Sequence, residues 1–527
     1  MTTPDRGAAG GRRGRPAAVD VGDGFLGVDI GTTNVKVLVI SERGDVVDVR
    51  ERPHRLHQDT STRQEIDPAE IIANVCALVP AAAASCAAQG VQIASLSFSI
   101  LGEAFVLLDE AGRCIGRSPV AMDQRGLRTL PWFREQIGET PLYERTGQPV
   151  HPMYTATKLA WWREARPQEY AEVAKVLDWQ AYLTTWMCGQ AVTDPSLATR
   201  MLLYDTAAGD WWPEMLDALA LRRDQLPAVR DAGSIAGDLL PEAAERLGLA
   251  AGLPVVVGSW DQACAAVAGA VREGVLMDSL GTTQALIAHA PRGLEPAPFM
   301  PKGYQLTPAA VPGEQVVIGG SLSGALILRW LREQVGDFDA SAFDALMRAL
   351  RLAPATPLVL PHLTGAGTPL FDPRSMAAVI GATFHTTMLD LLEASLDGLA
   401  YEARTNIETL RALGVPIERV HVTGGLTSLG RTVQRKADAY GLAVAPLRNP
   451  HGSTLGAAIL AARGSGRPGV TEALVDELTR ADEPYLPDPD RAALHDARYA
   501  LHTRLYPALQ PIFAGLHELG ADAPPTR

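Results

Sequence analysis

The alternation of apolar runs and polar turns near the start of the chain predicts a small antiparallel sheet. Phe25 to Ile30 is largely apolar, residues 31–34 form a Gly-Thr-Thr-Asn turn, and Val35 to Ile40 is a second apolar run. A third short strand is expected at residues 46–49, after a turn that contains Ser, Gly and Asp. Short strands joined by such turns predict an antiparallel meander.

The next segments predict one capped helix and two more strands. Asp67 followed by Pro68 is typical of a helix start, because aspartate caps the first turn and proline fits it. We expect this helix to run to Val79. Apolar runs at residues 93–99 and 105–108 predict a strand and its hairpin partner.

Helices and strands alternate through the rest of the chain, and the pattern of residues 155–220 is largely helical. Further strands are expected at residues 254–258, 274–280, 316–318, 420–422 and 442–445. Further helices are expected at residues 262–270, 324–334, 386–413, 432–440 and 453–462. Mixed helix and strand order in both halves predicts two α/β domains.

Four regions follow from this order. Residues 1–24 are rich in Gly, Ala and Arg and predict a disordered N-terminal extension. Residues 25–272 are expected to form a first domain and residues 273–465 a second one. Residues 466–527 are expected to hold a linker over 466–485 and one amphipathic helix over 490–518.

A short sequence motif occurs twice, once in each half of the chain. Val28-Asp-Ile-Gly-Thr-Thr and Asp278-Ser-Leu-Gly-Thr-Thr are both strand-to-turn junctions. The copies differ two residues before the glycine, where the first has Asp29 and the second has Ser279. Matched positions in two α/β halves indicate a duplicated unit.

A strand that ends in Gly-Thr-Thr is suited to binding phosphate. Glycine lets the backbone approach the oxygens, successive N–H groups point into one concavity, and the hydroxyls add donors. Asp29 would then be the natural ligand for Mg²⁺, which prefers one or two carboxylates with water and phosphate oxygens. Either turn alone is most simply an ordinary hairpin turn, whereas the pair favours phosphate binding.

Two further segments, each at the end of a predicted strand, have two alternative roles. Asp261 follows a predicted strand and precedes a helix of small residues, so it is either a helix N-cap or a general base at the end of a strand. Gly424-Gly425 is either a plain strand-to-helix turn or a place where a flat ring or phosphate lies against the backbone. Residues 452–458 are expected to serve helix packing.

Composition narrows the functional class. The chain has 527 residues, with 47 Lys+Arg against 60 Asp+Glu and a formal net charge of −13. An acidic chain of average hydrophobicity predicts a folded protein that does not bind nucleic acid. The charge balance does not exclude an anionic small molecule, because net charge says nothing about one cleft.

The cysteines and the N-terminus indicate a cytoplasmic protein. Five scattered cysteines without C-x-x-C spacing predict neither a disulfide framework nor a structural zinc site. The N-terminus lacks the apolar core of a signal peptide. No run is expected to approach the roughly 18 apolar residues that cross a bilayer, so no membrane contact is predicted.

Competing nucleotide motifs are absent or misplaced. A Walker A loop needs Gly-Lys-Ser/Thr, and none of the five lysines follows a glycine. One Gly-x-Gly-x-x-Gly match begins at Gly464, but it follows a helix in a proline-containing linker rather than joining a strand to a helix.

Taken together, these residues resemble the FGGY family of carbohydrate kinases from about Phe25 to Gly464. The matching segments, in chain order, are Asp29-x-Gly31-Thr32-Thr33, Glu65-x-Asp67-Pro68, Met153-x-Thr155-x-x-Lys158-Leu159-x-Trp161, Gly258-x-x-Asp261-Gln262, Gly281-Thr282-Thr283, and Gly424-Gly425 with Gln434 and Asp438. Each motif match is weak evidence by itself, whereas all of them together in this order are specific for the family.

The resemblance implies two ribonuclease-H-like domains of the actin-like ATPase fold, with the active site in the cleft between them. It implies ATP-dependent phosphorylation of a sugar or polyol hydroxyl, with Asp261 as base and Asp29 as the Mg²⁺ ligand. The residues implied to bind ATP or its phosphates are Gly31, Thr32, Thr33, Lys36, Gly281, Thr282, Thr283, Gly424 and Gly425. The residues implied to bind substrate are Gly102, Glu103, Met153 and Gln262.

Departures from the family pattern bear on the substrate. Glycerol kinases carry Arg-Glu where this chain has Gly102-Glu103, and a tyrosine where it has Met153. Xylulose kinases usually have a His-containing segment near residue 102, which is also missing here. In the adenosine segment, Leu429 replaces a polar residue, and Trp162 replaces an aliphatic one in the first signature. The pattern argues against glycerol and favours a ketose such as a pentulose.

Two alternatives stay open at this point. One is a kinase of a linear polyhydroxy-ketone signalling molecule. The other is a non-catalytic, nucleotide-dependent binding protein on the same fold, because fold does not fix function. The sequence does not reveal the oligomeric state, and a homodimer is one possible assembly.

Overall fold

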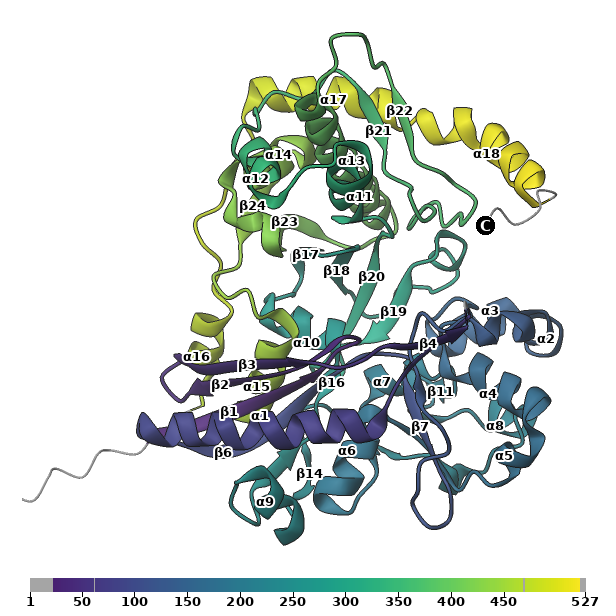
Figure 1. Ribbon diagram of the computed structural model, residues 1–527, viewed down its shortest axis with the longest axis vertical. Coiled ribbons are helices and arrows are strands. Elements are labelled where there is room, and N and C mark those ends of the chain that lie inside the picture. Colours follow the sequence, from purple (N-terminus) through teal and green to yellow (C-terminus); the bar gives the residue numbers. More distant parts are fainter. Residues whose placement is uncertain (1–21, 61, 468–469, 522–527) are drawn as a thin grey trace, which may run out of the picture.

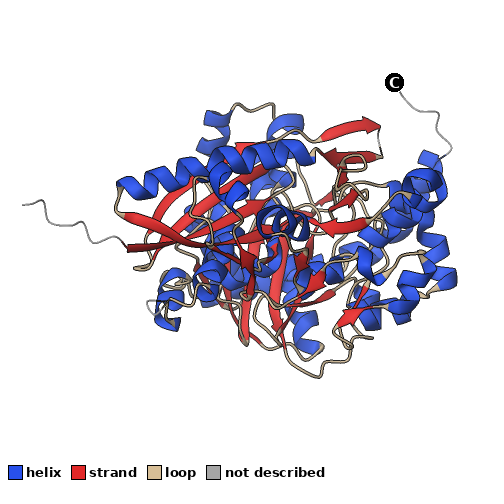
Figure 2. Cartoon of the chain, turned by 90° about the horizontal axis from the view of Figure 1, so that it is seen from below, coloured by secondary structure: helices blue, strands red, loops and turns tan. Residues whose placement is uncertain are grey.

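Two mixed sheets organise the chain, one in each half (Figure 1). The computed structural model describes residues 22–60, 62–467 and 470–521. The first sheet has seven strands in the order β14-β15-β6-β1-β2-β3, with β16 also paired to β6. The second has six strands in the order β19-β20-β18-β17-β23-β24. Helices lie around the strands of both sheets (Figure 2).

The first sheet begins with the predicted meander, since β1, β2 and β3 pair antiparallel. Strand β6 runs parallel to β1, and both β15 and β16 run parallel to β6. Its strands are β1 (Gly22–Ile30), β2 (Asn34–Ser41), β3 (Val46–Pro53), β6 (Val91–Ile100), β14 (Ile235–Asp238), β15 (Pro254–Val256) and β16 (Ser259–Trp260).

Two helices cover opposite faces of the first sheet. Successive side chains of a strand point to opposite faces, and in β2 Val37 is buried with residues of α1 (Pro68–Ala88), whereas Leu38 is buried with residues of α15 (Gly452–Gly464). Both helices contact β1, β2 and β6. The sheet is therefore a central layer, and α15 belongs to it although it follows the second sheet in the chain.

The second sheet repeats the arrangement of the first. Strand β17 ends at the second Gly-Thr-Thr turn, pairs antiparallel with β18, and lies parallel to β23 on its other side. Strand β1 has the same two kinds of neighbour, β2 and β6. Its strands are β17 (Gly274–Leu280), β18 (Gln284–Ala290), β19 (Gln305–Pro308), β20 (Gln315–Ser321), β23 (Ile417–Thr423) and β24 (Ala443–Pro446). The predicted duplicated α/β unit is confirmed.

Helices and short strands between β6 and β14 form a separate apolar cluster rich in tryptophan, which includes Trp161, Trp162, Trp211 and Trp212. The elements of this region and of the segment before α1 are β4 (His57–Thr60), β5 (Arg63–Ile66), β7 (Phe105–Leu108), β8 (Ser118–Pro119), η1 (Arg125–Thr129), α2 (Leu130–Gln136), α3 (Glu139–Thr146), α4 (Thr155–Ala165), α5 (Pro167–Ala171), β9 (Lys175–Asp178), α6 (Trp179–Cys188), β10 (Val192–Thr193), α7 (Pro195–Arg200), β11 (Tyr204–Asp205), β12 (Asp210–Trp211), α8 (Pro213–Ala218), η2 (Arg223–Gln225) and β13 (Ala228–Val229).

The remaining helices and strands pack around the two sheets. They are α9 (Pro241–Leu247), α10 (Asp261–Ala268), η3 (Met300–Lys302), α11 (Leu326–Trp330), η4 (Leu331–Val335), α12 (Ala340–Arg348), β21 (Leu358–Leu360), β22 (Ala378–Ile380), α13 (Met388–Ala412), η5 (Gly425–Ser428), α14 (Gly430–Tyr440), α16 (Glu472–Leu478), α17 (Pro489–His502) and α18 (Leu505–Ala521). The expected helix at residues 324–334 is α11 followed by one π-helical turn, η4.

Helix α1 differs from expectation in two ways. Asp67 caps it as predicted, with Oδ1 accepting the Ala69 N–H at 2.9 Å, but the helix continues through Pro80 to Ala88 instead of ending at Val79. Its 21 residues are apolar enough, by length and composition, to cross a membrane, so the expectation that no run approaches that length is wrong. The helix packs on β2, β3 and β6, which accounts for its apolar face.

Three other expectations are corrected. Strand β7 is not the hairpin partner of β6 but pairs antiparallel with β9. The expected linker at residues 466–485 contains α16, whose Leu474 and Val475 are buried against the first sheet. The expected single helix at residues 490–518 is divided into α17 and α18.

The predicted domain boundaries are not tested by these contacts and stay predictions. The expected disordered extension at residues 1–24 lies outside the described residues up to residue 21, and Gly22–Gly24 belong to β1. Figure 1 shows α15 and α16 beside β1, β2 and β3, so the chain returns to the first sheet after building the second.

We predict that Gly456→Ala lowers the thermal unfolding midpoint, because a Cβ there would lie 2.0 Å from the Cys264 main-chain oxygen where α15 crosses α10. Overpacking of this kind costs about 1–3 kcal/mol. The matched control is Gly452→Ala in the same helix, where a Cβ meets no atom within 4 Å. Equal midpoints for the two variants in differential scanning calorimetry would contradict this packing of α15.

Candidate active site

The candidate active site lies where three neighbouring strands of the first sheet, β1, β6 and β16, end at the same edge. Asp29 of β1 lies opposite Ser99 of β6, and Ser99 lies opposite Ser259 of β16. The Ser99 hydroxyl donates a 2.5 Å hydrogen bond to Asp29 Oδ1. Asp261 follows two residues after Ser259. Both acidic side chains therefore lie at the carboxyl ends of parallel strands, where active sites of α/β folds open.

Asp29 is half-buried, and burial raises the pKa of its carboxyl group. A hydrogen bond from a serine of β6, the charge of Lys36 and the hydroxyls of Ser453 and Thr454 offset part of this rise. Lys36 lies opposite Asp29 on β2 and forms an ion pair with Glu51 at 3.6 Å. The start of α15 therefore contacts Asp29, although residues 452–458 were expected to serve mainly helix packing.

Asp261 is the first residue of α10, and Trp260 occupies the N-cap position without a side-chain cap. The N-cap alternative for Asp261 is therefore wrong. Its Oδ1 is buried and accepts no hydrogen bond from the described residues. Burial, the charge of Asp29 and the charge of Glu103 together raise the pKa of Asp261 to about 7. A carboxyl group with this pKa is suited to accept a proton near neutral pH.

A buried network holds the backbone before Asp261. The Ser259 hydroxyl donates to Asp194 Oδ2 at 2.8 Å, and the Trp260 N–H donates to the Ser196 hydroxyl at 3.0 Å. Asp194 also caps α7 by accepting the Ser196 N–H at 3.1 Å. These contacts join β16 to α7 and fix the direction in which α10 begins.

Glu103 and Gly102 follow the end of β6 and lie near Asp261 and Trp260. Glu103 is buried, has a φ of 64°, and forms an ion pair with Arg200. A Cβ on Gly102 would lie 2.6 Å from Trp260 Nε1. Gly102 therefore leaves the space that the Trp260 indole fills.

Met153 contributes its backbone to a buried lysine site. Lys158 Nζ donates to the main-chain oxygens of Met153 at 2.5 Å, Val120 at 2.7 Å and Glu103 at 3.4 Å. Burial lowers the pKa of Lys158 to about 7. One amine thus binds three segments together, two of which carry predicted substrate residues. Gln262, the second residue of α10, lies half-buried beside Asp261.

The first Gly-Thr-Thr turn lies at the end of β1. The Gly31 N–H donates to the Asn34 main-chain oxygen at 3.0 Å, and the Gly31 carbonyl meets His54 Nε2 at 3.0 Å. Thr32 is half-buried and Thr33 is exposed. The turn is therefore fixed from behind, while its hydroxyl-bearing residues remain accessible.

The second turn and the Gly424-Gly425 pair lie at the ends of adjacent parallel strands, because Ser279 of β17 pairs with Thr423 of β23. Residues 281–283 are exposed. Gly424 has a φ of 112°, and a Cβ there would lie 2.3 Å from the Leu280 main-chain oxygen, so no other residue fits. A Cβ on Gly425 would meet no atom within 4 Å, which leaves open space in front of it.

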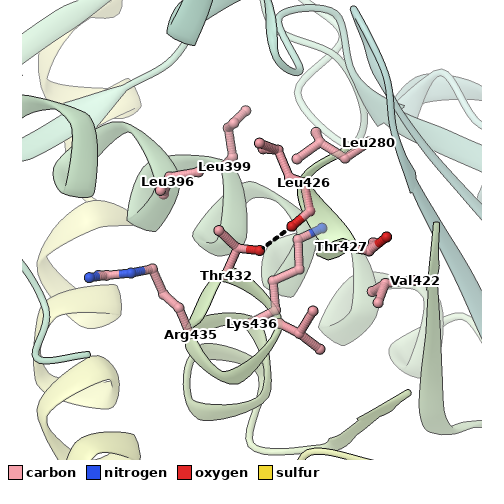
Figure 3. A pocket seen from close by; sticks show the side chains of 10 residues that line it. Leu280, Leu396, Leu399, Val422, Leu426, Thr427, Thr432, Arg435 and Lys436 are labelled. Atoms are coloured by element: carbon pink, nitrogen blue, oxygen red, sulfur yellow. Dashed lines mark hydrogen bonds between the residues drawn. The ribbon is translucent and has the colours of Figure 1, made fainter. Parts of the chain in front are cut away.

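A pocket beside this glycine pair has apolar walls and a polar edge (Figure 3). The polar edge includes Thr427, Thr432 and Lys436. Lys436 forms an ion pair with buried Asp278, to which the Tyr440 hydroxyl also donates at 2.7 Å. The apolar lining comes from Leu280, Leu396, Leu399, Val422, Leu426 and Val433.

Two residues of the expected adenosine segment face away from this pocket. Gln434 Nε2 donates to Asp438 Oδ1 at 2.9 Å, and Arg491 Nε donates to Asp438 Oδ2 at 2.5 Å. They join α14 to α17, so their contacts are with protein. Leu429 is half-buried at the N-cap of α14 and forms no side-chain cap.

The donor set fits magnesium. In the described ranges, no three His, Cys, Asp or Glu side chains gather as a metal-binding group. Asp29 supplies one carboxylate at the end of β1, just before the first Gly-Thr-Thr turn. Mg²⁺ prefers one or two carboxylates with water and phosphate oxygens, whereas zinc prefers nitrogen and sulfur ligands.

Sequence reasoning missed several residues of the site, namely Ser99, Asp194, Arg200, Trp260 and Ser453. Trp260 adjoins Asp261 and could have been noted on that ground. Ser99 lies three residues before Gly102 and Ser453 lies within residues 452–458, so neighbouring motifs could have pointed to both. Asp194 and Arg200 belong to the cap and the end of α7 and carry no motif, so only the fold brings them to the site.

Comparisons with known proteins agree with this geometry. Residues 25–268 match the model of the FGGY family of carbohydrate kinases, N-terminal domain, and residues 276–465 match that of the C-terminal domain. Xylulose kinase of Escherichia coli strain K12 is 28% identical over 497 residues, which cover 93% of this chain and all of that protein. Gluconokinase of Bacillus subtilis strain 168 is 25% identical over 509 residues, which cover 94% of this chain and 96% of that protein.

The crystal structure of xylulose kinase from Rhodospirillum rubrum has the same architecture. It superimposes with a TM-score of 0.85 at 25% sequence identity, covering 93% of this chain and all of that one. The expected fold of two ribonuclease-H-like domains is thereby confirmed.

We predict that Asp261→Asn stabilises the fold more at pH 8 than at pH 5. The pKa of Asp261 in the folded chain lies above its ordinary value of 3.8, so unfolding releases a proton between pH about 4 and about 7. The contribution of this group to stability therefore falls as the pH rises through that window. Thermal melts at both pH values test this, with exposed Asp217→Asn as control; equal gains at pH 5 and pH 8 would refute it.

Proposed function

Because this chain belongs to the FGGY family of carbohydrate kinases, we propose that it transfers the γ-phosphoryl group of ATP to one hydroxyl of a neutral ketose or polyol, with a pentulose favoured. One observation carries the proposal. Asp261 has a buried carboxylate oxygen to which no described residue donates a hydrogen bond, and a pKa of about 7, beside Asp29 at the ends of parallel strands.

The proton transfer is assigned to Asp261. Asp261 Oδ1, to which no described residue donates a hydrogen bond, accepts the proton of the substrate hydroxyl. At the same time the hydroxyl oxygen of the substrate attacks the γ-phosphorus. The new O–P bond forms as the bond between the γ-phosphorus and the β,γ-bridging oxygen breaks, and ADP leaves. The burial that raises the pKa of Asp261 also makes the carboxylate a stronger base.

The phosphates are assigned to the two Gly-Thr-Thr turns. N–H groups and hydroxyls of residues 31–33 and 281–283 would bind them, with Lys36 adding positive charge, and the base would rest at Gly424-Gly425. Asp29 would hold Mg²⁺, which when bound neutralises charge that develops on the phosphate oxygens. Exclusion of water by closure of the two halves would direct the phosphoryl group to the sugar.

The charges of the site favour a neutral substrate over an aldonate. Asp29 and Glu103 both raise the pKa of Asp261, so the site repels negative charge. The nearby cations already have partners, because Arg200 pairs with Glu103 and Lys158 binds main-chain oxygens. A carboxylate on the substrate would find no free cation among these residues, whereas hydroxyls can bind Glu103 and Gln262.

The other candidate functions have less support. A non-catalytic binding protein would be expected to lose the base or the magnesium ligand, and both Asp261 and Asp29 are present. A linear polyhydroxy ketone would use the same geometry and therefore falls within the same test. A cytoplasmic location and a homodimeric assembly remain part of the proposal.

The test is ADP release across a panel of pentuloses, hexuloses, polyols, linear polyhydroxy ketones and aldonates. We expect a neutral ketose or polyol to give the highest kcat/KM, with aldonates far below it. Asp261→Asn should bind ATP normally and lose about 100- to 10,000-fold in kcat, the usual contribution of a general base. Asp217→Asn, an exposed control, should behave as the wild type.

Near-wild-type turnover of Asp261→Asn would remove the base from the mechanism. An aldonate as the preferred substrate would overturn the charge argument.

A further inference from the structure

Arg200 is a buried arginine whose guanidinium is fixed on several sides. It is the last residue of α7, and its side chain is 2% exposed. The guanidinium carbon lies 4.1 Å from the ring centroid of Trp260 and 5.0 Å from that of Tyr154. Trp260 directly precedes Asp261, so Arg200 packs against the side chain of the residue next to the proposed base.

The hydrogen bonds of Arg200 leave one oxygen of Glu103 free. Arg200 Nε and Nη2 both donate to Glu103 Oε1. Lys158 and Thr155 hold the main-chain oxygen of Glu103, each at 3.4 Å. Within the part of the chain that the structure describes, Glu103 Oε2 accepts no hydrogen bond. Glu103 therefore offers one acceptor oxygen near Asp261, whose pKa it raises.

The same guanidinium reaches the second half of the chain. Arg200 Nη1 donates at 2.8 Å to Gln305 Oε1, on β19, and also to Gln148 Oε1. With its oxygen bound to Arg200, the half-buried Gln305 has its amide N–H₂ group left as a donor, for which no acceptor occurs among the described residues.

Strand β19 is firmly attached at this point. The Leu306 N–H donates to the Gly147 main-chain oxygen at 2.9 Å, and the Tyr143 hydroxyl donates to the Tyr304 main-chain oxygen at 2.7 Å. Gln148 Nε2 donates to Thr307 Oγ1 at 3.0 Å. Gln305 is thus held against the first half of the chain by contacts on both sides of it.

Glycine at position 102 is what admits this arrangement. A Cβ there would lie 2.6 Å from Trp260 Nε1 and 3.3 Å from Arg200 Nε. Any larger residue would displace the indole, the guanidinium or both.

We propose that Arg200 is a positioning residue that sets which hydroxyl pattern the sugar site recognises. By binding Oε1 of Glu103 and Oε1 of Gln305, it turns a carboxylate acceptor from one half and an amide donor from the other toward neighbouring substrate oxygens. The matching ligand is a neutral chain with a hydroxyl that donates to Glu103 and an adjacent hydroxyl or ketone oxygen that accepts from Gln305. The proposal rests on the proposed sugar kinase function and extends it to residues without a motif.

The test compares Arg200→Lys and Gln305→Ala with the wild type, using the best sugar of the panel and its monodeoxy analogues. Arg200→Lys keeps the positive charge but loses the planar guanidinium group with its several fixed N–H donors. We therefore expect the KM for the sugar to rise about 10- to 100-fold, the usual effect of losing a charged hydrogen bond. The KM for ATP should stay within about twofold and kcat should change less than the KM for the sugar. Gln305→Ala should raise the KM for the sugar about 5- to 10-fold and leave Glu103 paired.

The deoxy analogues separate positioning from a merely structural role. If Arg200 orients Glu103, the preference for the parent sugar over one analogue should shrink in Arg200→Lys, because the hydroxyl missing from that analogue is no longer bound well. The matched control is Arg404→Lys, an arginine on α13 that pairs with Glu408 at 2.9 Å and stacks on Tyr499. It should keep the wild-type preference.

Three results would decide against the inference. Unchanged sugar KM in both variants would overturn it, as would an equal rise in the KM values for sugar and ATP. If Arg200→Lys fails to fold, Gln305→Ala alone decides, and a wild-type KM for that variant overturns the proposal. A wild type that phosphorylates no sugar of the panel would instead refute the proposed function itself.

Discussion

The rest of the site depends on one constraint, the burial of the Asp261 carboxyl group beside two other carboxylates at the ends of strands of the first sheet. Asp29, Glu103 and Asp261 lie near one another, and burial together with the negative charge of the first two raises the pKa of Asp261 to about 7. The charge of Arg200 offsets only part of this rise, and the ion pair of Arg200 is with Glu103. Under the proposed function, the same environment would suit Asp261 to act as the base and would disfavour a charged sugar, with Asp29 left to hold the divalent cation.

The fold keeps these charges close together by packing. Ser259 and Trp260 are bound to the capped start of α7, and α15 crosses α10 so closely that Gly456 admits no Cβ. Such contacts belong to elements that are distant in sequence, and together they resist the separation that charge alone would favour. The duplicated unit supplies the same strand-and-turn junction twice, and only the first copy carries the carboxylate at Asp29.

Local features of the sequence predicted the framework well. Apolar runs and turn residues indicated β1, β2 and β17, and the Asp67-Pro68 pair indicated the start of α1, because these signals depend on neighbouring residues only. Long-range pairing was not predictable in this way. Strand β7 pairs with β9, and Arg200 meets Gln305 from the other half of the chain. A buried arginine and a strand glutamine have no local signature, so Asp29, Glu103 and Asp261 could be named from sequence motifs but Arg200 and Gln305 could not.

The most direct test is the titration of Asp261 itself. Carbon-13 NMR of protein labelled at the aspartate carboxyl carbon can follow the signal that disappears in Asp261→Asn. The account predicts a midpoint near pH 7 in the wild type and a lower one in Asp29→Asn, because removing that charge relieves the repulsion. A midpoint near pH 4 in both proteins would contradict it.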